Sequence, residues 1–168
     1  SRPVNNVNVQ FTGLNNVFIT TEMVNKLLIQ SQEKPYFLNK EDIDLRELEF
    51  SLESNEMIKS AQVYLTVNST VMARVEQRVP IARVQNSEVF YIDDEGLRMP
   101  LSTQHSARVP MVYGIVEEDD LQRIYKLALT AYNDSFFKTY LTGIYLNHLF
   151  YQQLSHNFDK HHLTLPFY

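Results

Sequence analysis

The chain has 168 residues, of which 44% are hydrophobic, and a formal net charge of −5 at pH 7. The apolar fraction is sufficient for a buried core, whereas the acidic balance and the lack of a Lys/Arg run argue against nucleic acid and anionic lipid surfaces as partners. The chain contains no cysteine, which excludes disulfides, thiolate nucleophiles and cysteine metal ligands.

The N-terminal part shows one strand pattern followed by two helix patterns. Alternating apolar residues over 7–11 predict a first strand. The threonines at 20–21 can cap a first helix, and Asp44, with Glu47 three residues later, fits a capping box for a second. The apolar residues of the three patterns are Val7, Val9 and Phe11; Met23, Val24, Leu27 and Leu28; and Leu45, Leu48 and Leu52.

The stretch from Ala61 to Pro100 carries the clearest strand patterns. Residues 61–67 and 71–75 alternate between apolar and polar side chains, with a turn over 68–70 between them. Gly96 completes an Asp-Glu-Gly turn in which positive φ costs little. The resulting order of strand, helix, helix, strand, strand predicts a mixed sheet with both helices on one face. Free edges of such a sheet can bind other chains.

The C-terminal part begins with the strongest helix pattern, over 117–132, where four acidic residues precede an apolar stripe and suit the helix dipole. Asn133–Asp134 ends this helix or caps a short one that runs to Tyr140, and 144–146 follows as a possible strand. Segments 149–151 and 163–165 are further possible strands.

Four pieces of sequence, in this order, resemble the FtsQ/DivIB family of bacterial cell-division proteins, in the form found in Bacteroidetes-type bacteria. They are residues 16–28, residues 45–61, the basic-Pro-hydrophobic stretch 77–84, and residues 91–114 with Met99-Pro100 and Val109-Pro110. The resemblance implies an α+β fold, with a POTRA-like β-α-α-β-β domain over 5–83 and a β-rich domain with an amphipathic helix over 84–168. It also implies that the second domain continues as an antiparallel sheet whose last strands offer a free edge.

The resemblance further implies a non-enzymatic scaffold of the divisome. It also implies a single N-terminal membrane helix upstream of this sequence, which begins without Met and contains no apolar run of roughly 18 to 20 residues. This part would then lie in the periplasm at the division septum, held at the inner membrane. It would recruit partners of the FtsB and FtsL type and help regulate septal peptidoglycan synthesis by the FtsW–FtsI pair.

The expected binding mechanism is β-augmentation, in which a partner strand pairs with an exposed sheet edge. We place that edge at the end of the chain. The expected partner-binding residues are Leu163, Thr164, Leu165, Phe167 and Tyr168. Phe150, Tyr151, Phe167 and Tyr168 fit a core role and an interface role equally well, since aromatic residues serve both.

Candidate sites for chemistry have simpler interpretations. Adjacent His161 and His162 would point to opposite faces of a strand, so a metal site formed with His156 and Asp159 is disfavoured. The acidic cluster 93–95 lacks the ligand spacing of a Ca²⁺ loop and fits a turn. We therefore expect no cofactor, no metal and no catalytic set. His105 and His148 are interpreted as surface residues.

Two other functions remain open on the sequence alone. The first is a POTRA-bearing module of an outer-membrane protein assembly or secretion system, which usually contains tandem repeats that this chain lacks. The second is an enzyme or small-ligand binder that uses a pocket between the two units, which would require converging titratable groups.

Overall fold

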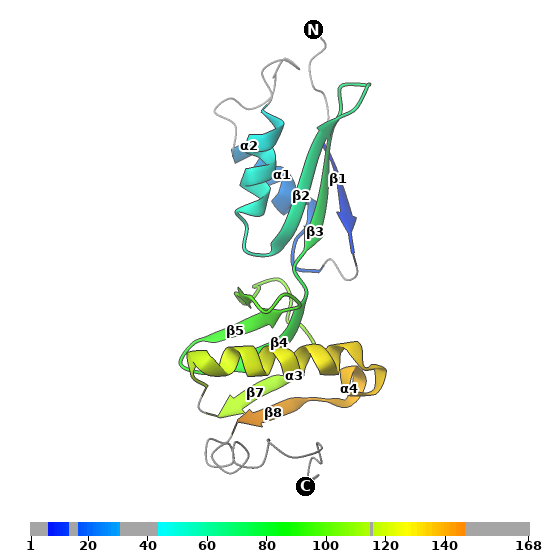
Figure 1. The fold of residues 1–168 in the computed structure, drawn as a ribbon. Helices are drawn as coiled ribbons and strands as arrows, with labels where there is room; N and C mark the ends of the chain where they lie inside the picture. The colour runs from blue at the N-terminus through cyan, green and yellow to red at the C-terminus, as the bar shows by residue number, and fades with distance from the viewer. Residues whose placement is uncertain (1–6, 14–16, 31–43, 115, 147–168) are drawn as a thin grey trace.

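The computed structural model describes residues 7–13, 17–30, 44–114 and 116–146. They form two units stacked end to end, each built on its own sheet (Figure 1). In chain order the elements are β1 (Val7–Thr12), α1 (Thr21–Gln30), α2 (Leu45–Glu53), β2 (Ile58–Leu65), β3 (Val71–Gln77), β4 (Pro80–Gln85), β5 (Val89–Asp93), β6 (Arg98–Met99), β7 (Met111–Gly114), a 3-10 turn (Glu118–Asp120), α3 (Leu121–Asn133), α4 (Ser135–Tyr140) and β8 (Gly143–Leu146).

The first unit has the β-α-α-β-β order expected of a POTRA-like domain, so this prediction is confirmed. Its sheet has the order β1-β3-β2, with β1 parallel and β2 antiparallel to β3. The parallel pair needs a long connection, which α1 and α2 provide while covering one face of the sheet (Figure 1). The core between sheet and helices contains Ile19, Val24, Leu28, Leu48, Leu52, Ile58, Ala61, Val63, Val71, Ala73 and Val75.

The two helices begin where the sequence predicts. Oδ1 of Asp44 accepts hydrogen bonds from the backbone N–H groups of Arg46 and Glu47, at 3.0 and 3.2 Å, which caps α2. Thr20 accepts from the N–H of Met23 at 3.3 Å at the start of α1. There the pKa of Glu22 is lowered by hydrogen bonds from its own backbone N–H and from the Thr20 hydroxyl.

The second unit has a five-stranded sheet of order β6-β5-β4-β7-β8, with α3 packed across one face (Figure 1). Pairs β4–β5 and β5–β6 are antiparallel, but β4–β7 and β7–β8 are parallel. The expectation of an antiparallel sheet toward its last strands is therefore wrong for the described part. The reason is that α3 and α4 lie between β7 and β8, so the chain crosses over before β8 and re-enters in the same direction.

The boundary between the units lies earlier than residue 83. Strand β3 ends at Gln77 in the first sheet, and β4 starts at Pro80 and pairs only with strands of the second sheet. A division at 83/84 would cut through β4, so the structure moves it to Arg78–Val79. The stretch 77–84 therefore carries the chain from the first sheet to the second, where β4 pairs with β5 in an antiparallel hairpin.

No helix in the described ranges combines the length and apolar character needed to cross a bilayer.

Candidate functional site

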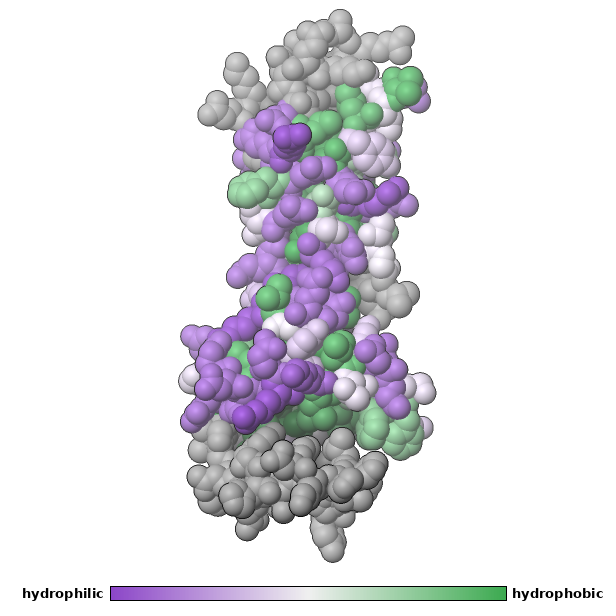
Figure 2. All heavy atoms as spheres, viewed as in Figure 1, coloured by the Kyte–Doolittle hydropathy of each residue, from purple (hydrophilic) through white to green (hydrophobic). Residues whose placement is uncertain are grey.

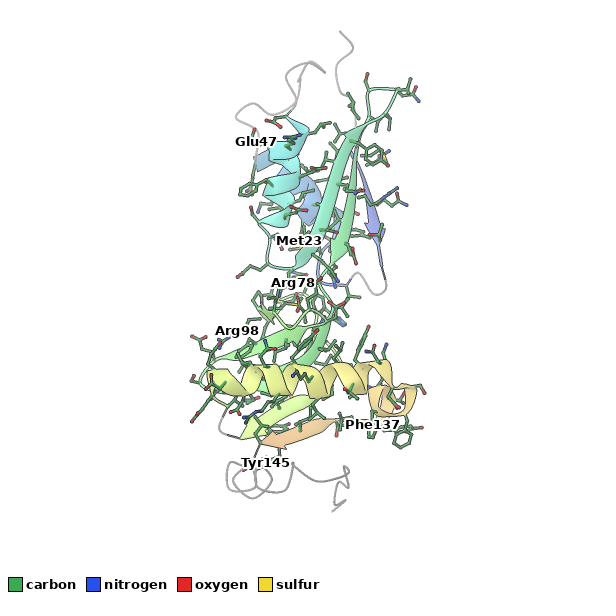
Figure 3. The ribbon with its side chains drawn as sticks, viewed as in Figure 1. Met23, Glu47, Arg78, Arg98, Phe137 and Tyr145 are labelled. Atoms are coloured by element: carbon green, nitrogen blue, oxygen red, sulfur yellow. The ribbon has the colours of Figure 1, made fainter. Side chains whose placement is uncertain are left out.

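Arg78 joins the two units at their boundary (Figure 3). Its Nε donates to Oδ2 of Asp93 at 2.8 Å, and its side chain is only 13% exposed. The remaining guanidinium nitrogens donate to the Glu56 carbonyl at 2.9 Å and to the Arg98 carbonyl at 2.7 Å. Because Glu56 belongs to the first unit and the other two acceptors to the second, one side chain fixes both units to the linker.

The acidic cluster 93–95 is used structurally. Asp93 is 1% exposed, and its Oδ1 accepts from the N–H groups of Glu95 and Leu97 at 3.1 and 2.7 Å, which shapes the turn before β6. Lys59 of the first unit lies 3.4 Å from carboxylate oxygens of both Asp94 and Glu95. Burial of Lys59 disfavours its charged form, but the two carboxylates outweigh this effect and raise its pKa. These carboxylates therefore shape the turn before β6 and pair with Lys59 at the junction between the units.

The edge strand β2 is closed by two glutamates of α2. Oε1 of Glu49 accepts from the outward N–H of Val63 at 2.8 Å, and Oε1 of Glu53 accepts from that of Ala61 at 3.1 Å. Four residues of a helix rise about 6 Å, which nearly matches about 6.8 Å for two residues of a strand. The helix can therefore supply an acceptor to every second residue of the strand, and these two edge donors are already paired.

Replacing both Glu49 and Glu53 with Ala is expected to open the β2 edge. Each lost acceptor should lower the free energy of unfolding by about 1 kcal/mol, and the two freed N–H groups should promote pairing between copies of the chain. Sedimentation velocity over a concentration series would measure this self-association. The matched control is Glu47→Ala on the same helix, which should remain monomeric. A double variant that stays as monomeric as this control would contradict the proposed role of the glutamates.

Strand β8 is the last strand of the second sheet among the described residues and pairs only with β7. The N–H of Met111 donates to the carbonyl of Thr142 at 3.0 Å. In a parallel ladder, this hydrogen bond determines which residues of β8 direct their backbone N–H and C=O groups toward β7. Residues 142, 144 and 146 direct their backbone groups toward β7, whereas Gly143 and Tyr145 direct theirs away from it. This side of β8 therefore offers backbone donors and acceptors to another strand.

The side chains of β8 differ between its two faces. Leu146 is buried and Ile144 packs on the same core, beneath α3. Tyr145 points to the opposite face and is 74% exposed, next to Tyr113 of β7, its partner in the strand register. An exposed tyrosine pair along an open strand is an arrangement that suits protein contacts.

Helix α4 adds a cluster of exposed aromatic rings just before β8. Asp134 caps α4 by accepting from the N–H groups of Phe136 and Phe137. The Phe136 ring lies 4.9 Å from that of Tyr140 and 5.7 Å from that of Phe137. Phe136 and Tyr140 are 62% and 67% exposed, and Figure 2 shows a hydrophobic patch at this end of the second unit. Together with β8 and its tyrosines, these rings form the candidate site.

The remaining strands at the sheet edges are weaker candidates. Strand β6 has only two residues. In strand β1, Val9 and Phe11 pack toward the helices, and Asn8, Gln10 and Thr12 lie on the opposite, open face. That face of β1 therefore has no aromatic anchor. Among the described edges, β8 therefore combines free backbone with aromatic side chains.

The partner-binding residues predicted from sequence, Leu163, Thr164, Leu165, Phe167 and Tyr168, lie outside the described residues, as do Phe150 and Tyr151. The predicted edge there stays a prediction. Sequence reasoning foresaw a strand at 144–146 but missed its role as an edge. The spacing of Phe136, Phe137 and Tyr140 after a capping Asp was the available signal for the aromatic cluster.

Metal-binding side chains do not cluster in the described part of the chain. In these ranges no three His, Asp or Glu side chains are placed to hold a metal ion. His148, His156, His161, His162 and Asp159 lie outside them. A cavity of about 320 Å³ between the units is lined by apolar residues together with Gln77, His105, Arg108, Tyr132 and Lys138, and by no carboxylate.

Comparison with known families agrees with this organisation. A model of the FtsQ/DivIB C-terminal related domain matches residues 79–165, and a model of the POTRA-like domain matches residues 4–76. No curated protein matches the chain. The first match covers more than half of the sequence, and the two ranges meet where β3 gives way to β4. The chain therefore belongs to the FtsQ/DivIB-related family of cell-division proteins, with a POTRA-like domain preceding the FtsQ/DivIB-related one.

Proposed function

We propose that this chain is the extracytoplasmic part of a single-pass inner-membrane protein that recruits divisome partners through the edge of β8. The family is a non-enzymatic, membrane-anchored one. The partners would be of the FtsB and FtsL type, and through them the protein would help regulate septal peptidoglycan synthesis by FtsW and FtsI.

The observation that carries this proposal is the contrast between two edges. The outward donors of Ala61 and Val63 on β2 are paired with α2 carboxylates. Those of Gly143 and Tyr145 on β8 point away from the only described strand that pairs with it. A partner segment that adds a strand would therefore gain main-chain hydrogen bonds at β8, and the neighbouring aromatic rings would anchor its side chains.

Proline at position 145 tests the mechanism. Tyr145→Pro removes an outward N–H but none that faces β7, so the fold should survive, as edge strands tolerate proline. Affinity for a purified extracytoplasmic FtsB-type segment, measured by biolayer interferometry, should fall at least tenfold. Tyr145→Ala keeps the N–H and separates loss of the ring from loss of the donor.

A second proline variant, Thr164→Pro, tests the edge expected at Leu163–Leu165. If Thr164→Pro abolishes binding and Tyr145→Pro leaves it unchanged, the partner uses the C-terminal edge and β8 is the wrong strand. If neither variant weakens binding, β-augmentation at both edges is rejected. Co-purification of the full-length protein from cells distinguishes the divisome role from the outer-membrane assembly or secretion role. An outer-membrane barrel as the main co-purified protein would favour assembly or secretion.

A further inference from the structure

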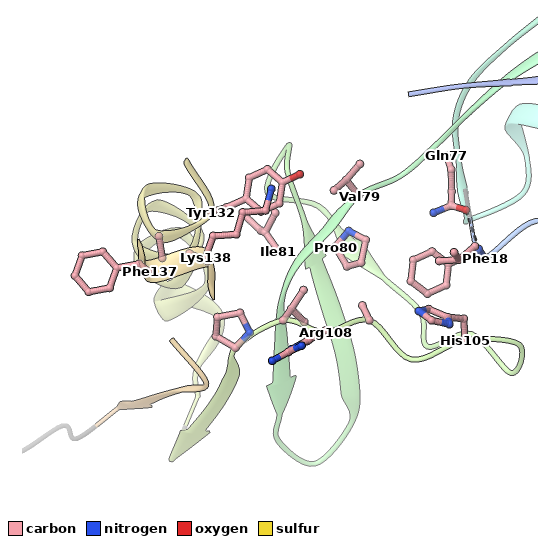
Figure 4. A pocket seen from close by; sticks show the side chains of 16 residues that line it. Phe18, Gln77, Val79, Pro80, Ile81, His105, Arg108, Tyr132, Phe137 and Lys138 are labelled. Carbon is pink, nitrogen blue, oxygen red and sulfur yellow. Dashed lines mark hydrogen bonds between the residues drawn. The ribbon is translucent and has the colours of Figure 1, made fainter. Parts of the chain in front are cut away.

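We propose that the cavity between the two units, called here the junction pocket, binds a peptide segment that carries an acidic side chain beside apolar ones. The pocket has a volume of about 320 Å³ and is walled by residues of both units (Figure 4). It lies apart from the outward edge of β8, and the inference does not depend on the function proposed above. Clefts between domains are common ligand sites.

The inner wall of the junction pocket is apolar. Val79 and Ile81 come from the linker and β4, Ala128 and Ala131 from α3, and Pro110 from the residue before β7. Ile81 and Ala128 are each 1% exposed and belong to the core of the second unit, so they support the wall from behind, and the half-buried Val79 and Pro110 supply its accessible apolar surface. Such a surface favours an apolar side chain.

The rim of the junction pocket is basic although the protein as a whole is acidic. Arg108 and Lys138 both line it, and none of its lining residues is Asp or Glu, in a chain with 20 acidic and 15 basic residues. Neither cation forms an ion pair with another described residue. Lys138 Nζ instead lies over the Tyr132 ring, 4.0 Å from its centre. The rim therefore holds two cations available to a carboxylate.

The opposite end of the junction pocket is fixed by contacts within the protein. Oε1 of Gln77 accepts from the N–H of Phe18 at 2.8 Å, and the His105 ring meets the Phe18 ring edge-on, with 5.6 Å between centres. In Figure 4, Phe18 and Phe137 lie at opposite ends of the lining, so the pocket is elongated. An extended peptide suits this shape better than a compact anion does, with its acidic residue at the basic rim and its apolar neighbours on the wall.

Titration of the ¹⁵N-labelled chain with two capped peptides tests the proposal. The probes are acetyl-Leu-Glu-Phe-amide and its twin with Gln in place of Glu, followed by NMR. The Glu peptide should shift the amide signals of Val79, Arg108 and Lys138, and the Gln twin should bind about tenfold more weakly, which corresponds to about 1.4 kcal/mol. No shift at these residues, or equal affinity for the two peptides, would overturn the proposal.

Variants of the rim provide the second readout. Arg108→Gln combined with Lys138→Gln should weaken the Glu peptide about tenfold and leave the Gln twin unchanged. Lys126→Gln is the matched control, because Lys126 is exposed on α3 and does not line the pocket. Unchanged affinity in the double variant would refute the role of the two cations. Tighter binding of 3-phenylpropionate than of the Glu peptide would reject the peptide in favour of a small carboxylate.

Discussion

Replacing Arg78 with Met is expected to lower the free energy of unfolding by about 3 kcal/mol. Asp93 is 1% exposed, and the Arg78 guanidinium is the cation paired with it. Without that partner the carboxylate remains buried and charged, which is the costly way of breaking an ion pair. The variant also removes the donors to the Glu56 and Arg98 carbonyls, so the junction between the two units loses three hydrogen bonds or ion-pair contacts of one side chain, and the contacts of Lys59 with Asp94 and Glu95 remain.

Urea unfolding followed by circular dichroism and tyrosine fluorescence would measure the change. We expect the two probes to give less coincident transitions for Arg78→Met, because the units would then be coupled more weakly. Arg74→Met is the control, since Arg74 is exposed on the neighbouring strand β3 and surface changes usually stay within about 0.5 kcal/mol. A loss below about 1 kcal/mol for Arg78→Met would show that the contacts of Arg78 do not hold the units together.

Replacing Gly114 with Ala is expected to detach β8 from the sheet. Gly114 has φ of +106°, where side chains other than hydrogen are strained. A Cβ there would lie 2.3 Å from the carbonyl oxygen of Leu146, a backbone atom that cannot move unless β8 moves. We expect a loss of about 3 kcal/mol in stability and, if the proposed function holds, of partner binding as well.

Gly143→Ala is the matched control for Gly114→Ala. The added Cβ at 143 would meet a ring carbon of Tyr113 at 3.4 Å, an ordinary contact with a side chain, and φ at Gly143 is not positive. Hydrogen exchange should show faster exchange of the Ile144 and Leu146 amides in Gly114→Ala and native rates in the control. Equal protection in the two variants would mean that β8 tolerates a side chain at position 114.

The edge of β8 was hidden from sequence reasoning because it depends on the order of strands in space. The pattern at 144–146 predicts a strand and Gly143 a helix end. Neither says that α3 and α4 form a crossover that returns the chain parallel to β7. The same crossover reversed the expectation of an antiparallel sheet, since only a direct hairpin connection requires antiparallel neighbours.

The sequence by itself determined the local elements of this protein. The alternation of apolar and polar residues predicts β1 to β3, and the apolar stripes predict the buried faces of α1, α2 and α3. Asp44 and Asp134 determine where α2 and α4 begin. These signals can be found in the sequence because they act between residues close in the chain. Tertiary structure alone decided which edges are closed. Glu49 and Glu53 look like solvated helix residues until α2 lies along β2, and Arg78 finds Asp93 only when the two sheets meet. Such pairings join residues distant in sequence, and the packing of whole elements brings them together.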